Sequence, residues 1–485
     1  MYNSLVMEPF ALIIFGVSGN LAQLKLIPAL YDLEDKNLLP EGTFVVGIAR
    51  KEWSHEDYCN YIKEVLAMEN RHHRHEIKPE VVKSLLSKMN YLRGDFESGK
   101  GYKELKTYLE KKGSAGQNHL YYLATYPQFY GSIFNCLNEY GMNKQDNGWV
   151  RLMIEKPIGN NEESAKELDG LLHKYFSEEQ IFRLDHYMGK ETIQNILVFR
   201  FGNGIMQPLL NHRHVDHIQI TLAEDFGIGK RGGYFDSVGE LRDMGQNHIL
   251  QMLAIATMEA PKEFTNREIT DRRIEILQSL KADPKKIVFG QYNGYLYEEK
   301  VAANSVSDTF FALKTEIDND TWRGVPIYIR TGKKLAQTVA EISMIFKSPE
   351  NKMFSDYTLG DWPNVLTYRI QPHEGIGFSM LVKKPGHKLQ LDSDFMQYCY
   401  KTGKNDLPDA YEKLIYDAIT GDPTFFNDAP EVEAAWKFID KLMKAKGIPE
   451  TYEPGGWGPE SANKLIEDDG RKWLQPSAIL CTSPL

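Results

Sequence analysis

The sequence predicts an α/β protein of two domains, a Rossmann-like doubly wound parallel sheet followed by a larger α+β domain built on a mainly antiparallel sheet. The chain has 485 residues, more than one hydrophobic core usually organises. Apolar runs alternate with helical patterns over roughly its first third, as strands and helices do in a doubly wound sheet. After about residue 210 the apolar residues follow a two-residue period, which is typical of antiparallel strands.

The chain opens with a predicted strand, turn and helix. FALIIFG is a short apolar run of the kind that a buried parallel strand needs. VSGN follows as the turn, and LAQLKLIPALYDLEDKN then carries apolar residues at helical spacing. Three later runs predict further buried strands: FVVGIAR (44–50), HLYYLAT (119–125) and WVRLMIEKP (149–157). The polar stretch NNEESAKELDG (160–170) is expected to begin a solvated helix rather than to form a linker.

The second part of the chain shows strands with one polar face. In HIQITLAED the apolar residues Ile218, Ile220 and Leu222 share one face, and AEISMIFK, VLTYRIQP and GFSMLV repeat the pattern. This alternation predicts an antiparallel sheet that is covered on one face only. We place the boundary near residue 180. Residues 1–180 are expected to bind a dinucleotide, and residues 181–485 to bind substrate and to form the oligomer.

Composition and charge narrow the class of protein. With 42% hydrophobic and 26% charged residues, the chain has the composition of an ordinary globular protein. Its net charge of −10 argues against broad binding to nucleic acid or to an anionic membrane, although a single phosphate needs only a few local cations. The early apolar run lacks a basic segment before it and is too short to span a bilayer. We therefore expect a soluble protein of a reducing compartment, the cytoplasm.

The cysteines predict neither a zinc site nor a disulfide framework. The chain has four, Cys59, Cys136, Cys399 and Cys481, which lie far apart and form no CxxC pair. No other cluster of metal ligands is evident in the sequence, so no metal is expected.

Two glycine-rich segments compete as the dinucleotide turn. GIGKRGG (227–233) contains a literal G-x-G-x-x-G, but it follows an alternating strand, and the GYFD after it is not expected to open a helix. GVSGNLA (16–22) lies between a buried strand and a helix, where backbone N–H groups and the helix dipole bind a pyrophosphate. Gly16 and Gly19 would permit a close backbone approach. The alternative is a plain turn between strand and helix, where glycine is common.

The end of the second strand indicates which dinucleotide binds. An NAD site places an acidic residue there to bond the ribose 2′-hydroxyl, whereas an arginine accommodates the 2′-phosphate of NADP. Here the strand ends in Arg50 and Lys51, which favours NADP. Glu52 follows closely, so NAD remains possible.

The stretch RLDHYMGKE (183–191) carries five potentially charged side chains. If it is helical, His186 and Lys190 share a face that suits a phosphate monoester, and Tyr187 adds a hydroxyl. Asp185 then points about a quarter-turn away and is free to orient another group. The alternative is a solvated salt-bridge cluster on the surface.

Two later segments support a site rather than a surface cluster. GGYFDSVGELRDMGQNHILQML (232–253) leads from a glycine-rich turn into a helix that carries Asp243 and His248. A single histidine in an apolar helix is also compatible with a satisfied core residue. Together with VPIYIRTGKK (325–334), the two acid-and-histidine segments and the dinucleotide turn form a constellation in which each member strengthens the others.

In these segments the chain resembles the glucose-6-phosphate dehydrogenase family. The matches are FGVSGNLA, EKPIG (155–159), RLDHYMGKE, RGGYFDSVGELRDMGQNHILQM, VFGQY (288–292), RTGKK, LPDAYEKLIYDAITGD (407–422) and WGPESANKLIEDDG. They run in the family's order from near residue 11 to near residue 474, essentially the whole chain. The resemblance implies oxidation of glucose 6-phosphate at C1 to 6-phosphogluconolactone, with hydride transfer to NADP, as the first step of the oxidative pentose phosphate pathway. It also implies a homodimer or homotetramer.

The resemblance assigns roles position by position. The catalytic pair it implies is the general base His248 and the carboxylate that orients it, Asp185. The residues implied to bind substrate are Lys156, His186, Tyr187, Lys190, Glu224, Asp243 and Lys333. The residues implied to contact coenzyme are Gly16, Ser18, Gly19, Asn20, Leu21, Arg50 and Lys156. Lys156 is expected between substrate and nicotinamide, and Pro157 after it is expected to act as a hinge.

Elementary chemistry agrees with the catalytic pair. The C1 hydroxyl must lose its proton as hydride leaves C1, and an imidazole that titrates near neutrality is a suitable base. A carboxylate behind the imidazole fixes its tautomer and stabilises the imidazolium that forms. No free oxyanion arises that would need a metal ion.

The chain departs from the family pattern at two positions. Asn20 stands where the family usually has Asp, and because Asn also caps helices the expected effect is mild and concerns coenzyme choice. Thr338 stands where the family usually carries a second cation, which predicts a raised Michaelis constant, partly offset by Lys334. Two other functions are alternatives: a related NAD(P)-dependent sugar oxidoreductase with another substrate, and a non-catalytic dinucleotide-binding sensor. The phosphate clamp in RLDHYMGKE argues against an unphosphorylated sugar, and retention of His248 with Asp185 argues against a sensor.

Overall fold

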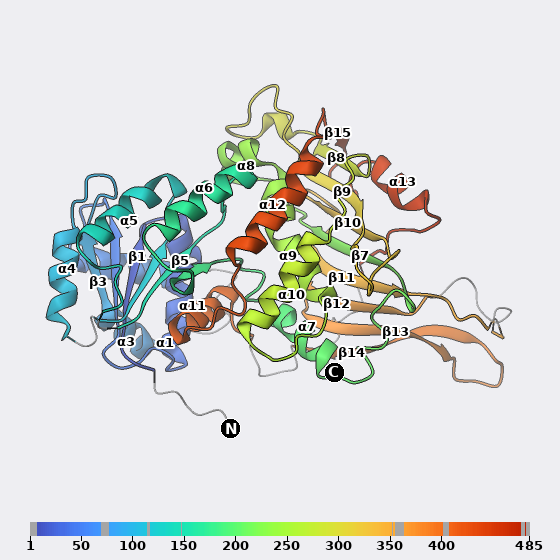
Figure 1. Cartoon of the computed structure of the whole chain (residues 1–485), viewed down its shortest axis with the longest axis horizontal. Coiled ribbons are helices and arrows are strands. Elements are labelled where there is room, and N and C mark those ends of the chain that lie inside the picture. Colours follow the sequence, from blue (N-terminus) through green and yellow to red (C-terminus); the bar gives the residue numbers. More distant parts are fainter. Residues whose placement is uncertain are drawn as a thin grey trace. The chain divides into compact units, whose positions relative to one another are not determined.

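The computed structural model describes residues 7–68, 77–113, 117–146, 148–351, 353–354, 363–400, 407–476 and 481. Within these residues the chain forms two compact units (Figure 1). The first unit takes its residues from Met1–Gly159, Glu163–Gly189 and Pro408–Ala429, and the second from Asn160–Glu162, Lys190–Leu407 and Pro430–Leu485. The predicted division into a dinucleotide-binding domain of residues 1–180 and a second domain of residues 181–485 stays a prediction.

The first unit is a six-stranded parallel sheet in the order β3-β2-β1-β4-β5-β6, which confirms the Rossmann-like prediction. The strands are β1 (Ala11–Phe15), β2 (Phe44–Ala49), β3 (Met89–Arg93), β4 (His119–Leu123), β5 (Val150–Ile154) and β6 (Ile181–Arg183). Every residue of β1, β2 and β4 is buried, as their apolar runs predict. The strand order reverses between β1 and β4, and ligands of such sheets bind at the carboxyl ends of the strands beside this point.

Helices cover both faces of this sheet (Figure 1). They are η1 (Ala22–Leu26), α1 (Ile27–Asp35), α2 (His55–Ala67), α3 (Pro79–Lys88), α4 (Tyr102–Lys111), η3 (Pro127–Phe129), α5 (Tyr130–Glu139), α6 (Glu162–His173), η4 (Glu178–Gln180) and α11 (Ala410–Thr420). On one face, α4 and α5 share a hydrophobic core with the strands. On the other, α1 packs against α2, α3 and α11, although α11 comes from a distant part of the sequence. Helix α6 confirms that NNEESAKELDG begins a helix.

The second unit is built on a nine-stranded sheet in the order β14-β13-β12-β11-β7-β10-β9-β8-β15. The strands are β7 (Val215–Ala223), β8 (Ile287–Tyr292), β9 (Phe310–Thr315), β10 (Ile327–Gly332), β11 (Val339–Phe346), β12 (Val365–Gln371), β13 (Gly375–Lys383), β14 (Leu391–Cys399) and β15 (Glu450–Tyr452). Two neighbouring pairs, β7 with β10 and β8 with β15, are parallel, and the other described pairs are antiparallel. The predicted mainly antiparallel sheet is thereby confirmed.

Its helices are α7 (Glu191–Phe201), η5 (Gly229–Arg231), α8 (Gly232–Val238), η6 (Leu241–Ile249), α9 (Leu250–Thr257), α10 (Asn266–Gln278), η7 (Tyr295–Tyr297), α12 (Ala429–Met443) and α13 (Ser461–Glu467). The expectation that GYFD opens no helix is wrong, because it lies within α8. Gly232 permits this local fold, since a Cβ there would lie 2.0 Å from the carbonyl oxygen of Glu299. None of the helices in the described ranges has the length and hydropathy that crossing a bilayer requires.

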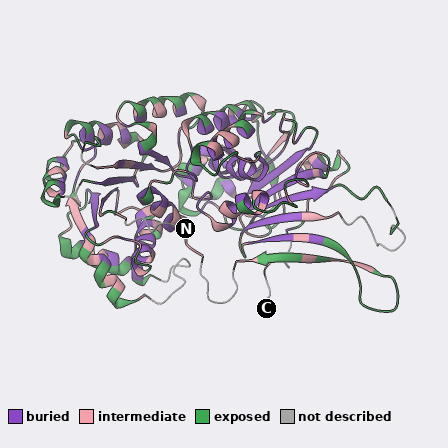
Figure 2. Ribbon diagram, turned by 60° about the horizontal axis from the view of Figure 1, so that its bottom comes forward, coloured by how far each residue is buried: buried purple, intermediate pink, exposed green. Residues whose placement is uncertain are grey.

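The prediction that the second sheet is covered on one face only is wrong for its central strands. All eight residues of β11 are buried, as are the polar residues His217, Gln219 and Thr221 of β7. The C-terminal segment supplies the cover: Gln219 donates to the carbonyl oxygen of Lys472 over 2.8 Å and accepts from the N–H of Leu474 over 2.8 Å. Alternation of side chains distinguishes polar from apolar faces, but it does not show that another segment will hydrogen-bond to the polar face. Exposure is extensive toward the edge strand β14 (Figure 2), and the opposite edge strand, β15, is also partly exposed.

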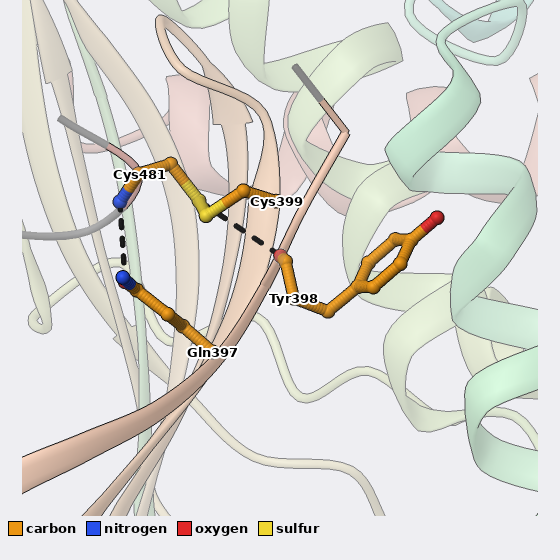
Figure 3. The surroundings of a disulfide bond; sticks show 4 residues. All are labelled: Gln397, Tyr398, Cys399 and Cys481. Atoms are coloured by element: carbon orange, nitrogen blue, oxygen red, sulfur yellow. Dashed lines mark hydrogen bonds between the residues drawn. A yellow bond between two sulfur atoms is a disulfide. The ribbon is translucent and has the colours of Figure 1, made fainter. Parts of the chain in front are cut away.

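The expectation of no disulfide is also wrong. Cys399, the last residue of β14, is bonded to Cys481, 82 residues later (Figure 3). The N–H of Cys481 also donates to Oε1 of Gln397 over 3.2 Å. Cys59 and Cys136 are free thiols. The pairing arises because the chain returns to the edge strand after a long interval, and spacing in the sequence does not reveal such a return.

Candidate active site

The glycine turn after β1 lines a pocket at the carboxyl ends of β1, β2 and β4. Gly16 has a φ of +96°, and a Cβ there would lie 2.3 Å from the carbonyl oxygen of Ala124, so only glycine fits. The N–H of Gly16 donates to the carbonyl oxygen of Ile48, the residue before the end of β2. Of the residues predicted to contact coenzyme, four line this pocket: Gly16, Ser18, Gly19 and Arg50. The pocket therefore lies where a doubly wound sheet binds its ligand.

The helix after this turn begins at Asn20 and continues as the π-helix η1. The carbonyl oxygen of Gly19 accepts the N–H of Gln23 over 3.1 Å, so Gly19, which has no side chain, occupies the capping position. The capping expected of Asn20 is therefore not seen, and Asn20 and Leu21 do not belong to the residues that line the pocket. A helix start at the mouth of a glycine turn suits an anion such as a pyrophosphate.

Charges at the end of β2 distinguish the two coenzymes. Arg50 is exposed and lines the pocket. Glu52, the acidic residue that kept NAD possible, does not line it and forms an ion pair with Arg93 at 2.5 Å. Lys51 lies over the ring of Trp53, 4.5 Å from its centroid. Arg50 is thus the basic residue of this strand end that faces the pocket, which suits a 2′-phosphate.

The predicted helical reading of RLDHYMGKE is wrong, because residues 184–190 form turns between β6 and α7. Asp185 causes this local fold. Its Oδ1 accepts the N–H of Tyr187 over 2.9 Å, and its carbonyl oxygen accepts the N–H of Met188 over 3.0 Å. Asp and Asn commonly compete with helix formation in this way. The side chain of Asp185 is 1% exposed, so it is a buried carboxylate and not part of a solvated cluster.

The three residues predicted to bind the phosphate, His186, Tyr187 and Lys190, have different surroundings. His186 stacks on Tyr411 of α11, with ring centroids 6.0 Å apart and planes inclined by 15°, and it meets Tyr187 edge-on at 5.1 Å. Tyr187 is buried. The turn packs tightly on α11 at Gly189, where a Cβ would lie 2.5 Å from the carbonyl oxygen of Ala410, the first residue of that helix. Lys190 is the N-cap residue of α7 and belongs to the second unit.

A buried arginine holds the strand that ends beside Asp185. The Arg183 side chain is 1% exposed, and its guanidinium nitrogens lie 2.5 Å from a carboxylate oxygen of Glu178 and 2.5 Å from one of Asp169. Its carbonyl oxygen accepts the N–H of Asn427 over 3.0 Å. The sequence showed Arg183 only as one member of a charge run. The paired carboxylates lie 14 and 5 residues before it, at spacings that match no motif.

The EKP segment contains a carboxyl group that the sequence reasoning missed. Glu155 follows β5, and its Oε1 accepts the hydroxyl of Tyr122 over 2.5 Å. Desolvation raises the pKa of Glu155 to about 7, although hydrogen bonds from Tyr122 and Tyr411 and the charge of Lys156 act in the opposite direction. The Lys156–Pro157 bond is cis. An acidic residue directly after a buried parallel strand was the available signal.

In the second unit, acidic side chains surround one buried lysine. Lys333 is 1% exposed, and its Nζ lies 2.5 Å from Oε2 of Glu224 and 3.2 Å from Oε2 of Glu240. Burial opposes its positive charge, but Glu240, Glu224 and Asp243 outweigh burial and raise the pKa of Lys333 above its usual value. The predicted residues Glu224, Asp243 and Lys333 thus form one cluster. Glu240 is a member that the sequence reasoning missed.

His248 lies on the π-helix η6, which also carries Asp243. Both residues are buried, His248 completely. A π-helix bonds each residue to the one five positions on, so that residues five apart, such as these two, come onto nearby faces. Short π-helical stretches are frequent at functional sites.

Thr338, which stands where the family usually has a second cation, forms hydrogen bonds with a neighbouring residue. Thr338 donates its hydroxyl to Oδ1 of Asp225 over 2.6 Å and accepts the N–H of the same residue over 3.1 Å. Lys334, the expected partial substitute, pairs with Glu298 at 3.1 Å and lies over the ring of Tyr292. Its ammonium is therefore already engaged.

Comparisons with known proteins agree over the whole chain. Residues 13–195 match the family domain described as "Glucose-6-phosphate dehydrogenase, NAD binding domain", and residues 197–474 match "Glucose-6-phosphate dehydrogenase, C-terminal domain". "Glucose-6-phosphate 1-dehydrogenase" of Aggregatibacter actinomycetemcomitans is 39% identical over 98% of this chain and 99% of its own length. "Glucose-6-phosphate 1-dehydrogenase 2" of Mycobacterium tuberculosis is 37% identical over 96% of this chain and 95% of its own length.

Two solved structures are similar over nearly their full length. One, described as "Glucose-6-phosphate dehydrogenase in complex with its substrate glucose-6-phosphate", has a TM-score of 0.89 and 33% identity, covering 98% of this chain and 100% of its own. The other is glucose-6-phosphate 1-dehydrogenase from Mycobacterium avium, with a TM-score of 0.85 and 30% identity, covering 97% of this chain and 100% of its own.

Proposed function

Because the chain belongs to the glucose-6-phosphate dehydrogenase family, we propose that it oxidises C1 of glucose 6-phosphate to 6-phosphogluconolactone with NADP as hydride acceptor. This reaction is the first step of the oxidative pentose phosphate pathway. The observation that carries the proposal is that both family domains match, one after the other, from residue 13 to residue 474. The predicted division of roles fits this order, with residues 1–180 binding dinucleotide and residues 181–485 binding substrate and forming the oligomer.

The coenzyme is NADP. The geometry at Gly16 supports a dinucleotide, because a glycine turn lets the backbone approach a pyrophosphate. Arg50 lines the same pocket and suits the 2′-phosphate, while Glu52 is engaged by Arg93. When bound, the nicotinamide ring accepts the hydride from C1. Lys156 is proposed to lie between substrate and nicotinamide, and Asn20 and Leu21 to contact the coenzyme through the backbone.

His248 removes the proton of the C1 hydroxyl, and Asp185 orients its imidazole. Complete burial of His248 and the 1% exposure of Asp185 support this pair, because a base that works on a bound sugar needs a site from which water is excluded. The carboxylate fixes the imidazole tautomer and stabilises the imidazolium that forms, as in other histidine–carboxylate pairs.

Phosphate and sugar are bound by different residues. His186, Tyr187 and Lys190 hold the phosphate. Lys333 binds a sugar hydroxyl together with Glu224 and Asp243. The carboxylates of Glu224 and Glu240, 2.5 and 3.2 Å from its ammonium, would repel a phosphate dianion. The departure at Thr338 then weakens phosphate binding without changing the chemistry.

The first test is initial-rate reduction of coenzyme with glucose 6-phosphate, NADP and NAD, beside glucose, galactose 6-phosphate and 6-phosphogluconate. Turnover only with glucose 6-phosphate, and faster with NADP, is expected. Preference for another sugar would move the assignment to a related sugar oxidoreductase, and coenzyme binding without any turnover would indicate a sensor.

His248→Asn tests the base. Because Asn keeps hydrogen-bonding capacity but takes up no proton, turnover should fall by about 10²–10⁴-fold while glucose 6-phosphate still binds with nearly wild-type affinity. Coenzyme reduction measures turnover, and calorimetric titration measures binding. His173→Asn is the matched control, since His173 belongs to an exposed turn of α6 in the first unit. Unchanged turnover in His248→Asn would remove this residue from the mechanism.

The oligomer is a homodimer or homotetramer, and the hairpin β13–β14 is its proposed contact surface. Five apolar side chains there are more than a third exposed: Met380, Leu381, Val382, Met396 and Tyr398. By the pairing of the two strands, all of them except Leu381 lie on the same face of the hairpin. Exposed apolar surface of this kind is typical of association sites. Light scattering on a size-exclusion column measures the mass, and Val382→Lys should shift it toward the monomer.

The proposed location is the cytoplasm, which cell fractionation with an activity assay tests.

A further inference from the structure

Glu240 is a completely buried carboxyl group in direct contact with the substrate-binding cluster of the second unit. It precedes η6 and is 0% exposed. Its Oε1 accepts the hydroxyl of Thr331 over 2.9 Å, and its Oε2 lies 3.2 Å from Nζ of Lys333. Among the described residues, Oε2 accepts no hydrogen bond of good geometry. Burying a carboxylate oxygen that accepts no hydrogen bond destabilises the folded protein. Such a group in a native protein therefore needs an explanation.

Lys333 is shared between two carboxylates that differ in access. The Glu224 side chain is 15% exposed, so a bound sugar can reach it, whereas Glu240 is enclosed and cannot touch a ligand. The ammonium of Lys333 donates to Oε2 of Glu224 over 2.5 Å, whereas Glu240 contributes a negative charge 3.2 Å away without a hydrogen bond of good geometry. A sugar hydroxyl that donates to Glu224 withdraws negative charge from that carboxylate and so weakens the pair of Glu224 with Lys333. Glu240 is placed to keep Lys333 charged and fixed while that exchange takes place.

We propose that Glu240 is a positioning residue, which holds the ammonium of Lys333 from its buried side so that Glu224 is released to bind a sugar hydroxyl. Protonation of Glu240 removes this hold and strengthens the competing pair of Lys333 with Glu224. Affinity for the sugar therefore falls as the pH drops through the titration of Glu240. The inference rests on the proposed function, because it concerns how that substrate is bound.

The titration of Glu240 falls in the range where such a switch operates. Burial raises its pKa to about 7, and the charges of Glu224 and Asp243 act in the same direction. Lys333 and the Thr331 hydroxyl act in the opposite direction. Three further titratable groups face this cluster from other elements. Asp308 and Lys446 form an ion pair at 2.5 Å, and the hydroxyl of Tyr452 donates to the carbonyl oxygen of Lys333 over 2.6 Å.

The backbone at Glu240 is fixed without help from its side chain. Its N–H donates to the carbonyl oxygen of Asp308 over 2.8 Å, and the N–H of Leu241 donates to Oδ2 of the same residue over 2.8 Å. Gly239 has a φ of +76°, and a Cβ there would lie 2.4 Å from Asp308. Replacing the Glu240 side chain is therefore expected to leave this start of η6 in place.

The deciding experiment measures kcat and KM for glucose 6-phosphate in the wild type and in Glu240→Gln at about pH 6 and pH 8. At pH 8 the KM of the variant should be about tenfold higher, because the amide keeps the shape of the carboxylate but loses its charge. At pH 6 the two KM values should converge, since Glu240 is then mostly protonated in the wild type. The value of kcat should stay within about twofold at both pH values, because the base is untouched. Titration of the substrate phosphate cancels in the ratio of the two enzymes.

The matched control is Glu341→Gln, which removes another buried carboxylate of the same sheet, paired with Arg369 at 2.9 Å, and should leave the KM ratio near one at both pH values. Thr331→Val supplies a second measurement. Without the hydroxyl that favours the carboxylate, the midpoint of the KM–pH curve should move to higher pH. A KM ratio that is the same at pH 6 and pH 8, or a loss of kcat at unchanged KM, would overturn the inference. A wild-type enzyme that does not oxidise glucose 6-phosphate would instead overturn the proposed function.

Discussion

Among single residues, Gly16 has little freedom to change, because its left-handed backbone and the nearby oxygen of Ala124 both exclude a side chain. Its role could be predicted from the sequence, since a glycine between a buried strand and a helix is a local signal. Glu155 and Glu240 could not be predicted in the same way. Their partners, Tyr122 and Lys333, are 33 and 93 residues distant, and the folded chain alone brings them together.

Gly16→Ala should raise the KM for NADP by at least about tenfold, because a Cβ at this position displaces the turn that lines the pocket. Steady-state kinetics with saturating glucose 6-phosphate measure the effect. Gly113→Ala is the control, since Gly113 also has a positive φ but nothing lies within 4 Å of its added Cβ. Equal KM values in the two variants would show that the turn does not hold the coenzyme.

Arg50→Ala should lower kcat/KM for NADP by about tenfold or more and leave that for NAD nearly unchanged, since one charge-assisted contact to the 2′-phosphate is lost. The ratio of the two coenzymes is the quantity to measure. Lys51→Ala is the neighbouring control, because Lys51 lies over Trp53. A parallel decrease with both coenzymes would place Arg50 outside the recognition of the 2′-phosphate.

At the scale of elements, β1, β2, β4 and β5 could be predicted because a strand buried on both faces shows as an apolar run in the sequence. The strands β3 and β6 were not predicted, because β3 is only half-buried and β6 has three residues. The turns after β6 could not, because a single hydrogen bond from Tyr187 to Asp185 outweighs the helical spacing of His186 and Lys190. The contact between α1 and α11 was equally hidden, since the two helices are separated by most of the chain.

The contact of α1 with α11 makes a prediction about stability. Desolvation raises the pKa of Asp32 to about 7, and the negative charge of Glu412 on α11 acts in the same direction. A carboxyl group whose pKa is raised in the folded state makes the protein less stable as the pH rises from the ordinary pKa of 3.8 to about 7. Asp32→Asn should therefore raise the free energy of unfolding by about 1–2 kcal/mol at pH 8, a figure reduced for partial solvent exposure, and the gain should shrink toward pH 4.

Urea unfolding at several pH values checks this prediction. Asp35→Asn is the control, because Asp35 pairs with Lys78 at 2.7 Å and its replacement should not stabilise the protein. A gain for Asp32→Asn that does not depend on pH would mean that its charge is not the cause.

At the scale of the whole molecule, the first unit is assembled from three separate stretches of the chain. The late stretch supplies α11, which packs on α1, and Tyr411, which stacks on His186. A fragment of residues 1–189 should therefore be poorly soluble and should bind NADP more weakly than the whole chain. Adding residues 408–429 through a flexible linker should restore solubility, and coenzyme titration of the two fragments measures the difference. Equal binding by both fragments would show that α11 is dispensable for the coenzyme domain.

The same discontinuity constrains how the protein is made. A ribosome synthesises roughly 5–20 residues per second and releases the chain from its N-terminal end, so the six strands of the first sheet emerge well before the helix that covers α1. During that interval the surface of α1 that later packs against α11 is exposed in the nascent coenzyme domain. Chaperones that bind exposed apolar segments would meet this chain most often during the synthesis of the second unit. Codon changes that slow translation between the two stretches should therefore lower the yield of folded enzyme.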